Sequence, residues 1–282
     1  MVVVENGVPP RQVKEAVLFA FDDFSIPFRQ NLELHLINGK DSAPNRANVY
    51  KTPIVLRNGA LGDPDEHVHY YGTTMRIEGQ FRMWYIGRTG NDEDTANNEG
   101  YNGRLCYAVS NDGVNWEKPE LGLVEFNGSK RNNLVAFPQD ADISAGTVLH
   151  DPEDPDANRR FKINYELGPA FGNKMSVAYS PDGLNWTPSP DNPVGPVLEQ
   201  TGLIKFNGCY FVNGQGPGQA VVGRSVMTYA SYDFEHWTPA SVLSLSRSPG
   251  LAGPEWEDRA GLLEQVHLGA ALHDRGNVIL GV

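Results

Sequence analysis

The sequence predicts an all-β protein in which small antiparallel sheets are set radially around an axis, as in a β-propeller. Thirty glycines and twenty prolines are spread along the 282 residues, and both residue types interrupt helices and favour short strands joined by turns. The turn SNDGVNW at 110–116 recurs as SPDGLNW at 180–186 and, in altered form, as SYDFEHW at 231–237. Each copy follows a β-rich run and ends on a tryptophan, which is typical of a repeated structural unit.

These repeats divide one domain, residues 1–282, into successive units. The units span about 68–119, 143–190, 200–240 and 266–282. Residues 1–67 are expected to contribute ring closure or a partial blade. A sheet of three or four short strands cannot bury both faces alone, whereas radially arranged sheets cover one another. We therefore expect Trp116, Trp186 and Trp237 to occupy equivalent positions and to pack between neighbouring sheets.

Charge and cysteine content exclude several classes of function. The chain has 23 Lys and Arg against 35 Asp and Glu, a net charge of −12, which repels nucleic acid and anionic membrane surfaces. Cys106 and Cys209 lie in apolar runs without zinc-ligand spacing, so we expect buried thiols and no metal site. Chemistry carried by a pair of carboxyl groups would need no organic cofactor. No signal-peptide core precedes the first strands, which predicts a cytoplasmic protein if that terminus is native. The oligomeric state stays open.

Two glutamates recur at the starts of innermost strands, where a propeller's chemistry gathers near its axis. Glu199 precedes TGLIKFNG and Glu264 precedes VHLGAALHDRG, each followed by glutamine. Cleavage of a glycosidic bond needs two carboxyl groups, one with a raised pKa to protonate the leaving oxygen and one ionised. Glu264 and Glu199 are therefore catalytic candidates, with exposed loop acids as the equally weighted alternative.

Two histidines accompany these acids as candidate substrate-binding residues. A β-bulge at the start of its strand would bring His267 beside Glu264, where it could donate to a sugar hydroxyl or tune the carboxylate. His69 alternates with Val68 in EHVHYYG and so shares a strand face with His67. Two histidines are too few to hold a metal ion, so we expect them to form part of a polar pocket wall.

Several longer stretches carry a family resemblance. They are VLFAFDDFSI, YYGTTMRIEGQFRMWY, YAVSNDGVNWEKPELGLVEFNGSKRNNLV, DPEDPDANRRFKINYE and EQVHLGAALHDRGNVILGV. Together they resemble a bacterial group of five-bladed β-propellers related to the invertase, levansucrase and arabinanase superfamily, glycoside hydrolase families 32 and 43. The resemblance implies a five-bladed fold and a carbohydrate substrate.

By the same resemblance, aspartates of the first and second blades become candidates. Asp22 and Asp23 match the family's DD stretch, and Asp142 lies just before an innermost strand. We expect Asp23 and Asp142 to be catalytic and Asp22 to bind substrate, with an Asx turn or a strand-end cap as the alternative.

The sequence also departs from the family. It lacks WMNDPNG, an RDP opening a strand and an EC pair, and it ends at Val282 inside an expected strand. We expect an incomplete ring in which GNVILGV either pairs with the strand around Phe19 or leaves an open edge. These departures leave three functions to compare: a glycosidase or glycosyl-transferring enzyme, a non-catalytic sugar-binding or assembly propeller, and a sialidase-like enzyme suggested by the Asp-box-like turn.

Overall fold

The computed structural model describes part of the chain, which forms two compact units. The described residues are 2–4, 11–13, 54–89, 103–138, 143–167, 172, 174–219, 223–238, 242–245, 269–274, 276 and 279–281. The first unit, Met1–Pro53, contains the antiparallel pair β1 (Val2–Val4) and β2 (Arg11–Val13). Every other described element belongs to the second unit, Ile54–Val282.

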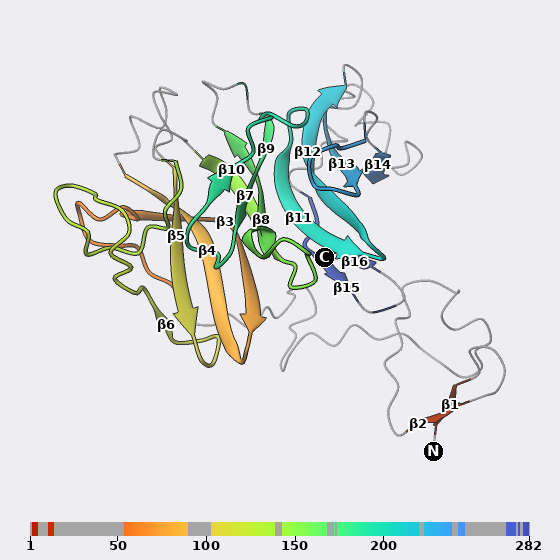
Figure 1. The fold of residues 1–282 in the computed structure, drawn as a ribbon, viewed down its shortest axis with the longest axis horizontal. Coiled ribbons are helices and arrows are strands. Elements are labelled where there is room, and N and C mark those ends of the chain that lie inside the picture. The colour runs from red at the N-terminus through yellow and green to blue at the C-terminus, as the bar shows by residue number, and fades with distance from the viewer. Residues whose placement is uncertain are drawn as a thin grey trace, which may run out of the picture. The chain divides into compact units, whose positions relative to one another are not determined.

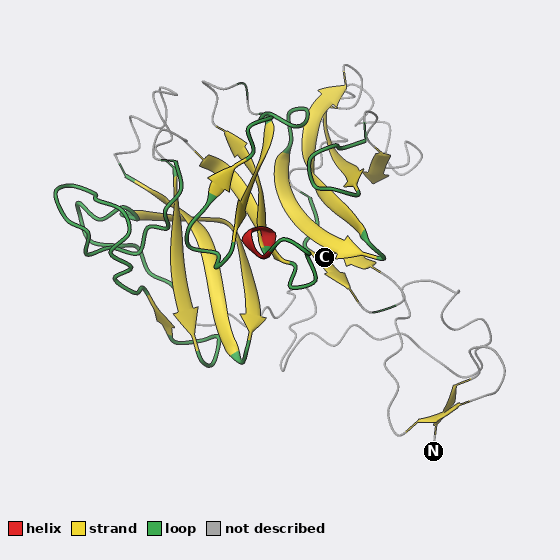
Figure 2. Cartoon of the chain, in the orientation of Figure 1, coloured by secondary structure: helices red, strands yellow, loops and turns green. Residues whose placement is uncertain are grey.

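The second unit is built from antiparallel sheets in chain order, which confirms the predicted all-β fold (Figure 2). The first sheet comprises β3 (His67–Ile77), β4 (Gln80–Arg88), β5 (Arg104–Ser110) and β6 (Trp116–Glu117). The second comprises β7 (Ile143–His150), β8 (Phe161–Leu167), β9 (Met175–Ser180) and β10 (Thr187–Pro188). The third comprises β11 (Glu199–Phe206), β12 (Cys209–Gln219), β13 (Gly223–Ser231) and β14 (Val242–Leu245).

Two smaller elements complete the described part of this unit. A single 3₁₀ turn, Ala157–Arg159, precedes β8. The pair β15 (Leu272–Asp274) and β16 (Ile279–Gly281) is antiparallel, so the described part of GNVILGV pairs with the strand before it. Phe19, its other expected partner, lies outside the described residues. No helix of the described residues is both long and apolar enough to cross a membrane.

The first strand of each sheet lies against the first strand of the next. Strand β3 contacts β7, β7 contacts β11, and β11 contacts β15 (Figure 1). This succession is the radial arrangement expected of propeller blades, with the first strand of each blade innermost. The expected unit boundaries, the five blades and the ring closure stay predictions.

The three repeated turns share one hydrogen-bond pattern. In each, a serine hydroxyl accepts the backbone N–H three residues later, and an aspartate carboxylate accepts two further backbone N–H groups. The serine–aspartate pairs are Ser110–Asp112, Ser180–Asp182 and Ser231–Asp233. All these donors lie within three residues of their acceptors, so the turn is specified locally.

The tryptophans after these turns follow the pattern with one departure. The indole N–H groups of Trp116 and Trp186 each donate to the glycine carbonyl of their own turn at 3.0 Å. In the third turn Phe234 takes the glycine's place with φ of 69°, and its ring stacks edge-on with Trp237 at 5.4 Å. The Trp237 indole N–H has no hydrogen-bond partner among the described residues. The third copy thus exchanges a hydrogen bond for aromatic packing.

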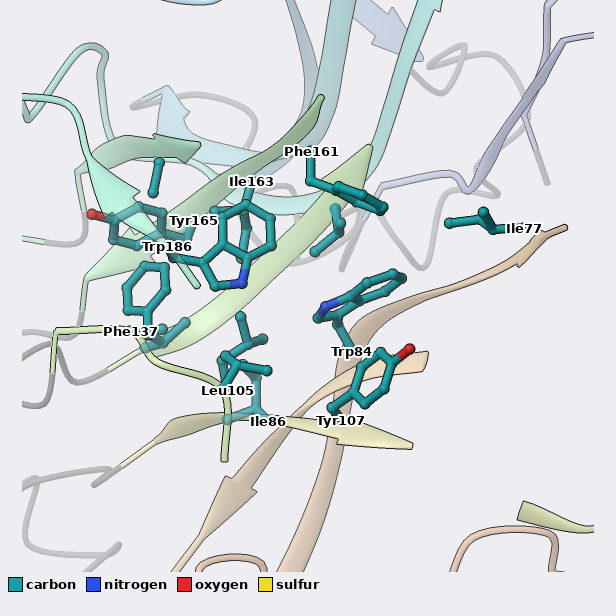
Figure 3. Close-up of a cluster of buried hydrophobic side chains, with 14 residues drawn as sticks. Ile77, Trp84, Ile86, Leu105, Tyr107, Phe137, Phe161, Ile163, Tyr165 and Trp186 are labelled. Atoms are coloured by element: carbon teal, nitrogen blue, oxygen red, sulfur yellow. The ribbon is translucent and has the colours of Figure 1, made fainter. Parts of the chain in front are cut away.

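A large aromatic cluster joins the first two sheets (Figure 3). Trp84 of β4 is fully buried, lies 5.3 Å from the Tyr107 ring and 5.8 Å from the Phe161 ring, and donates its indole N–H to the Gly183 carbonyl at 2.7 Å. A Cβ at Gly183 would stand 2.7 Å from the Trp84 ring, so this turn needs glycine for packing as well as for its φ of 79°. Cys106 and Cys209 are both buried, as predicted.

A buried ion-pair network joins the second and third sheets. Asp151, which follows β7, accepts the Tyr210 hydroxyl at 2.6 Å and the Lys205 ammonium at 2.9 Å. Lys162, fully buried, lies 3.5 Å from Asp151 and 2.6 Å from Asp154. Burial acts to raise the pKa of Asp151, but the hydrogen bonds from Tyr210 and Lys205, together with the positive charges of Lys162 and Lys205, outweigh it and hold that pKa below its usual value. Through these hydrogen bonds and ion pairs, Asp151 links the second sheet to the third.

Candidate active site

In each of the three four-stranded sheets the innermost strand carries a β-bulge near its first residues. The pairing shifts register between His69 and Thr73 in β3, between Ile143 and Ala145 in β7, and between Gln200 and Gly202 in β11. A bulge inserts an extra residue and redirects its side chain. The inserted residues include Tyr71, Ser144 and Thr201.

All three inserted side chains make contacts between elements. The Tyr71 hydroxyl hydrogen-bonds Glu199 of the third sheet, and the Ser144 hydroxyl donates to the backbone carbonyl of Glu166 on the neighbouring strand at 3.5 Å and lies close to the Glu166 carboxyl group. The Thr201 hydroxyl accepts the Gly269 N–H at 2.9 Å. The bulges therefore bring residues from three sheets together at the end of the innermost strands where β11 begins.

Glu166, on β8, has the most altered acidity in this group. Its side chain is buried, with 6% exposed, and lies on the strand that pairs with β7 and β9. Burial raises the pKa of Glu166 to about 8, the Ser144 hydrogen bond opposes the rise, and the negative charge of Glu199 adds to it. At neutral pH Glu166 is mostly protonated and can donate a proton.

Glu199 is the first residue of β11 and is held from both sides. Gln215 of β12 donates its side-chain N–H to Glu199 Oε2 at 3.0 Å, and the Tyr71 hydroxyl forms the second hydrogen bond. Burial raises the pKa of Tyr71 far above its usual value, and its bond to Glu199 adds to the effect, so the hydroxyl keeps its proton and donates it. A Cβ at Gly214 would stand 2.1 Å from the Glu199 carbonyl oxygen, so glycine lets β12 approach this residue.

His69 lies beside Tyr71, which hydrogen-bonds Glu199. Its ring stacks on the Tyr71 ring with centroids 4.4 Å apart and planes 16° from parallel. Burial, followed by the positive charge of Arg88, lowers the pKa of His69 to about 4, so its imidazole is neutral at pH 7. A neutral imidazole offers one donor and one acceptor to a ligand.

A pocket of about 720 Å³ runs along the innermost strands from this group. Its described lining comes from β3, β7, β11 and the segment that includes β15, among them His69, Tyr71, Thr73, Thr147, Gln200 and Thr201. The volume falls within the range of small-molecule sites, roughly 300–1,000 Å³. We call it the axial pocket. The described residues contain no group of three or more His, Cys, Asp or Glu side chains placed to hold a metal ion.

The sequence-based candidates divide into two groups. Glu199 and His69 lie in the described part of the chain, and both belong to the group around Tyr71. The other five candidates, Glu264, His267, Asp22, Asp23 and Asp142, lie outside the described residues. Their roles stay predictions.

Glu166 was missed by the sequence reasoning. In FKINYEL the polar Lys162, Asn164 and Glu166 alternate with apolar residues, which ordinarily indicates one solvated face. Here both faces are covered, and all three polar side chains are buried. In a propeller the second strand of a blade lies between two neighbours, so this alternation could have indicated a buried polar face.

Similarity to known proteins was found among solved structures. No protein-family model matches the sequence, and no curated protein matches it. Among solved structures it is similar to a glycoside hydrolase (TM-score 0.41, 20% identity, covering 61% of this chain and 53% of that one). It is similar to a family 32 β-fructofuranosidase from Bombyx mori (TM-score 0.43, 14% identity, 72% and 38% coverage). It is also similar to fructan 1-exohydrolase IIa from Cichorium intybus (TM-score 0.40, 18% identity, 63% and 31% coverage). This chain spans between about a third and about half of the lengths of these structures.

Proposed function

We propose that the protein is a carbohydrate-active enzyme that hydrolyses or transfers glycosidic bonds, with Glu166 and Glu199 as its carboxyl pair. The observation that carries the proposal is the raised pKa of Glu166 beside the charge of Glu199. Glycosidic bond cleavage requires two carboxyl groups whose environments give them opposite protonation states at one pH. The mechanism needs only protein side chains.

In the proposed reaction Glu166 is the general acid. It donates its proton to the glycosidic oxygen as the bond to the anomeric carbon breaks, which releases the leaving group as an alcohol. In one alternative Glu199 takes a proton from a water molecule that attacks the anomeric carbon. In the other, Glu199 itself attacks that carbon to form a glycosyl ester, and water then breaks the ester with the deprotonated Glu166 as its base. In both, the water supplies the new hydroxyl of the sugar, and an acceptor alcohol in its place gives transfer. A carboxyl separation of about 5 Å gives retention and one of about 6.5–9.5 Å gives inversion.

Tyr71 and Gln215 are positioning residues in this scheme. The Gln215 side chain donates to Glu199 Oε2, and the Tyr71 hydroxyl also hydrogen-bonds this side chain, so the two residues orient the Glu199 carboxylate. His69, neutral at pH 7 and stacked on Tyr71, is proposed to hydrogen-bond a sugar hydroxyl. The remaining sequence-based candidates keep their proposed catalytic or substrate-binding roles: Glu264, His267, Asp22, Asp23 and Asp142.

The test is a screen of aryl furanosides and pyranosides, followed by kinetics of Glu166→Gln and Glu199→Gln on a substrate that responds. Each variant keeps its side-chain shape but loses the carboxyl group, so we expect a drop in turnover of roughly a hundredfold or more with folding intact. Glu264→Gln is expected to act similarly. Unchanged rates for both Glu166→Gln and Glu199→Gln would refute the pair, and a chain that binds sugars but cleaves none would be a sugar-binding module.

A further inference from the structure

A group of basic side chains lies where β7 ends, between the first two sheets. It consists of His150, the last residue of β7, Arg82 of β4, and Arg160, which directly precedes β8. We call these three residues the basic cluster. The eight residues of β7 span roughly 23 Å, so the cluster lies far from the bulge at the start of that strand, and His150 is not part of the axial pocket lining.

Arg82 points toward the second sheet and leaves hydrogen-bonding capacity unused. It alternates along β4 with Trp84, whose ring lies 5.8 Å from the Phe161 ring of β8. Its Nε atom is buried and has no hydrogen-bond partner among the described residues. Its Nη2 atom lies 4.0 Å from a carboxylate oxygen of Glu78, a side chain that is 87% exposed. A guanidinium carries five N–H donors, so a buried donor without a partner favours an anion beside it.

His150 lies near both arginines. Its ring stacks on the Phe161 ring with centroids 4.5 Å apart, which holds the imidazole in place. Burial, followed by the positive charges of Arg82 and Arg160, lowers the pKa of His150, while the charges of Asp151 and Glu78 oppose the fall. The imidazole is therefore neutral at pH 7, and the two guanidinium groups act on the same space.

The surrounding acids do not neutralise the cluster. Asp151 is already paired with Lys162 and Lys205. Glu78 is exposed, so water screens its charge from Arg82. The cluster is thus locally positive in a chain whose net charge is −12. That net charge repels long polyanions, so the chemistry of the cluster favours a small anion.

We propose that the basic cluster binds a small tetrahedral oxyanion, phosphate or sulfate, with Arg82, Arg160 and the His150 imidazole as donors. A guanidinium pairs with two oxygens of such an anion through parallel N–H···O hydrogen bonds. The cluster is separate from Glu166 and Glu199, so this inference goes beyond the proposed function and does not rest on it.

Anion binding and protonation of His150 are linked in this proposal. A bound dianion offsets the charges of the two arginines that hold the pKa of His150 low, so this pKa should rise in the complex. A proton on His150 strengthens anion binding in return, about tenfold for each unit by which the pKa rises. The affinity should therefore increase as the pH falls below the pKa that His150 has in the complex. Sulfate is the suitable probe, because it keeps both charges over this range.

The test titrates the full chain with potassium sulfate, inorganic phosphate and glucose 6-phosphate by calorimetry, at an ionic strength held constant with potassium chloride. The variants are Arg82→Gln and Arg160→Gln, each of which removes one guanidinium. Arg76→Gln is the matched control, because Arg76 lies on the same hairpin but pairs with Phe81 on the opposite face of the sheet. NMR of the His150 ring gives its pKa with and without sulfate.

We expect one sulfate or phosphate to bind per chain, more tightly at lower pH for sulfate, and the His150 pKa to rise on saturation with sulfate. Arg82→Gln and Arg160→Gln should each weaken sulfate binding about tenfold or more, the effect of losing charge-assisted hydrogen bonds. Arg76→Gln should leave it nearly unchanged, because salt screens a charge on the other face. Tighter binding of glucose 6-phosphate than of inorganic phosphate would assign the site to a phosphate monoester, and equal binding would assign it to the free anion.

Three results would overturn the inference. They are no binding beyond the chloride background, equal weakening by Arg76→Gln and the two cluster variants, and a His150 pKa that sulfate does not change. Equal weakening would show that only the diffuse charge of the surface attracts the anion. Arg160 is exposed, so Arg160→Gln removes little packing and decides the test if Arg82→Gln does not fold. None of these measurements depends on cleavage of a glycoside.

Discussion

The unusual acidity of Glu166 predicts that this one residue makes the protein less stable as the pH rises. Its pKa is raised from 4.5 to about 8 in the folded protein, chiefly by burial. Between these two values the unfolded chain has lost the Glu166 proton and the folded protein keeps it, so the free energy of unfolding falls as pH rises. The contribution is fully present below about pH 4.5 and is lost once the pH has passed about 8.

The magnitude follows from the size of the shift. One pKa unit corresponds to about 1.4 kcal/mol, so Glu166 alone is expected to lower the free energy of unfolding by about that amount per pH unit between roughly pH 5 and 8. Gln cannot ionise and has the same shape. Glu166→Gln should therefore remove this slope and be more stable than the parent at pH 9, with the two proteins closest at pH 5.

The assay is urea unfolding of the parent and of Glu166→Gln from pH 5 to 9. Because all other titrating groups are the same in both proteins, their contributions cancel in the difference between the two free energies of unfolding. Carbon-13 NMR of the Glu166 carboxyl gives the pKa directly, in the parent and in Glu199→Gln. Because the Glu199 charge contributes to the rise and burial is the larger cause, Glu199→Gln should lower the Glu166 pKa without returning it to 4.5. Parallel stability curves for parent and Glu166→Gln, or titration of the parent carboxyl near pH 4.5, would refute the reasoning.

Three further predictions concern other contacts. Tyr71→Phe should lower kcat on a responsive glycoside about tenfold with little change in KM, because it removes a hydrogen bond that positions Glu199 and leaves the pocket shape unchanged; equal effects on both constants would contradict a positioning role. Gly183→Ala should destabilise the protein by about 1–3 kcal/mol, since its Cβ would stand 2.7 Å from the Trp84 ring at a φ of 79°, and thermal unfolding that matches the parent would contradict this packing. Asp151→Asn should lower the free energy of unfolding by about 3–5 kcal/mol at pH 7, because it leaves the fully buried Lys162 with one carboxylate fewer. The difference in stability between parent and variant should shrink as the pH falls below about 4, because the pKa of Asp151 is depressed in the folded protein. A difference that does not change with pH would count against the ion pairs.

Much of the fold could be predicted because its signals are local. The Ser–Asp turns close through hydrogen bonds between residues at most three apart, so their sequence determines their geometry wherever they occur. Their recurrence along the chain, each time after a β-rich run, then indicates repeated sheets. Neither the turn geometry nor the repetition of the sheets requires knowledge of which sheets pack against each other.

The candidate site was only half predictable. Glu199 was found because it starts an innermost strand, a position readable from the repeat. Glu166 was missed because the alternation of Lys162, Asn164 and Glu166 in β8 is also the pattern of a solvated face. Only the neighbouring sheet shows that this face is covered.

The sequence by itself determined the all-β class, the repeated turns and the positions of their tryptophans, and it predicted Glu199 as a candidate. Each of these depends on strand periodicity or on side chains bonding their own backbone, so near neighbours in the chain suffice. The tertiary structure alone decided the partner of Glu199, the acidity of Glu166 and the lining of the axial pocket. These properties depend on burial and on charges brought close from separate sheets, and a pKa is set by such surroundings rather than by residue type or position along the chain.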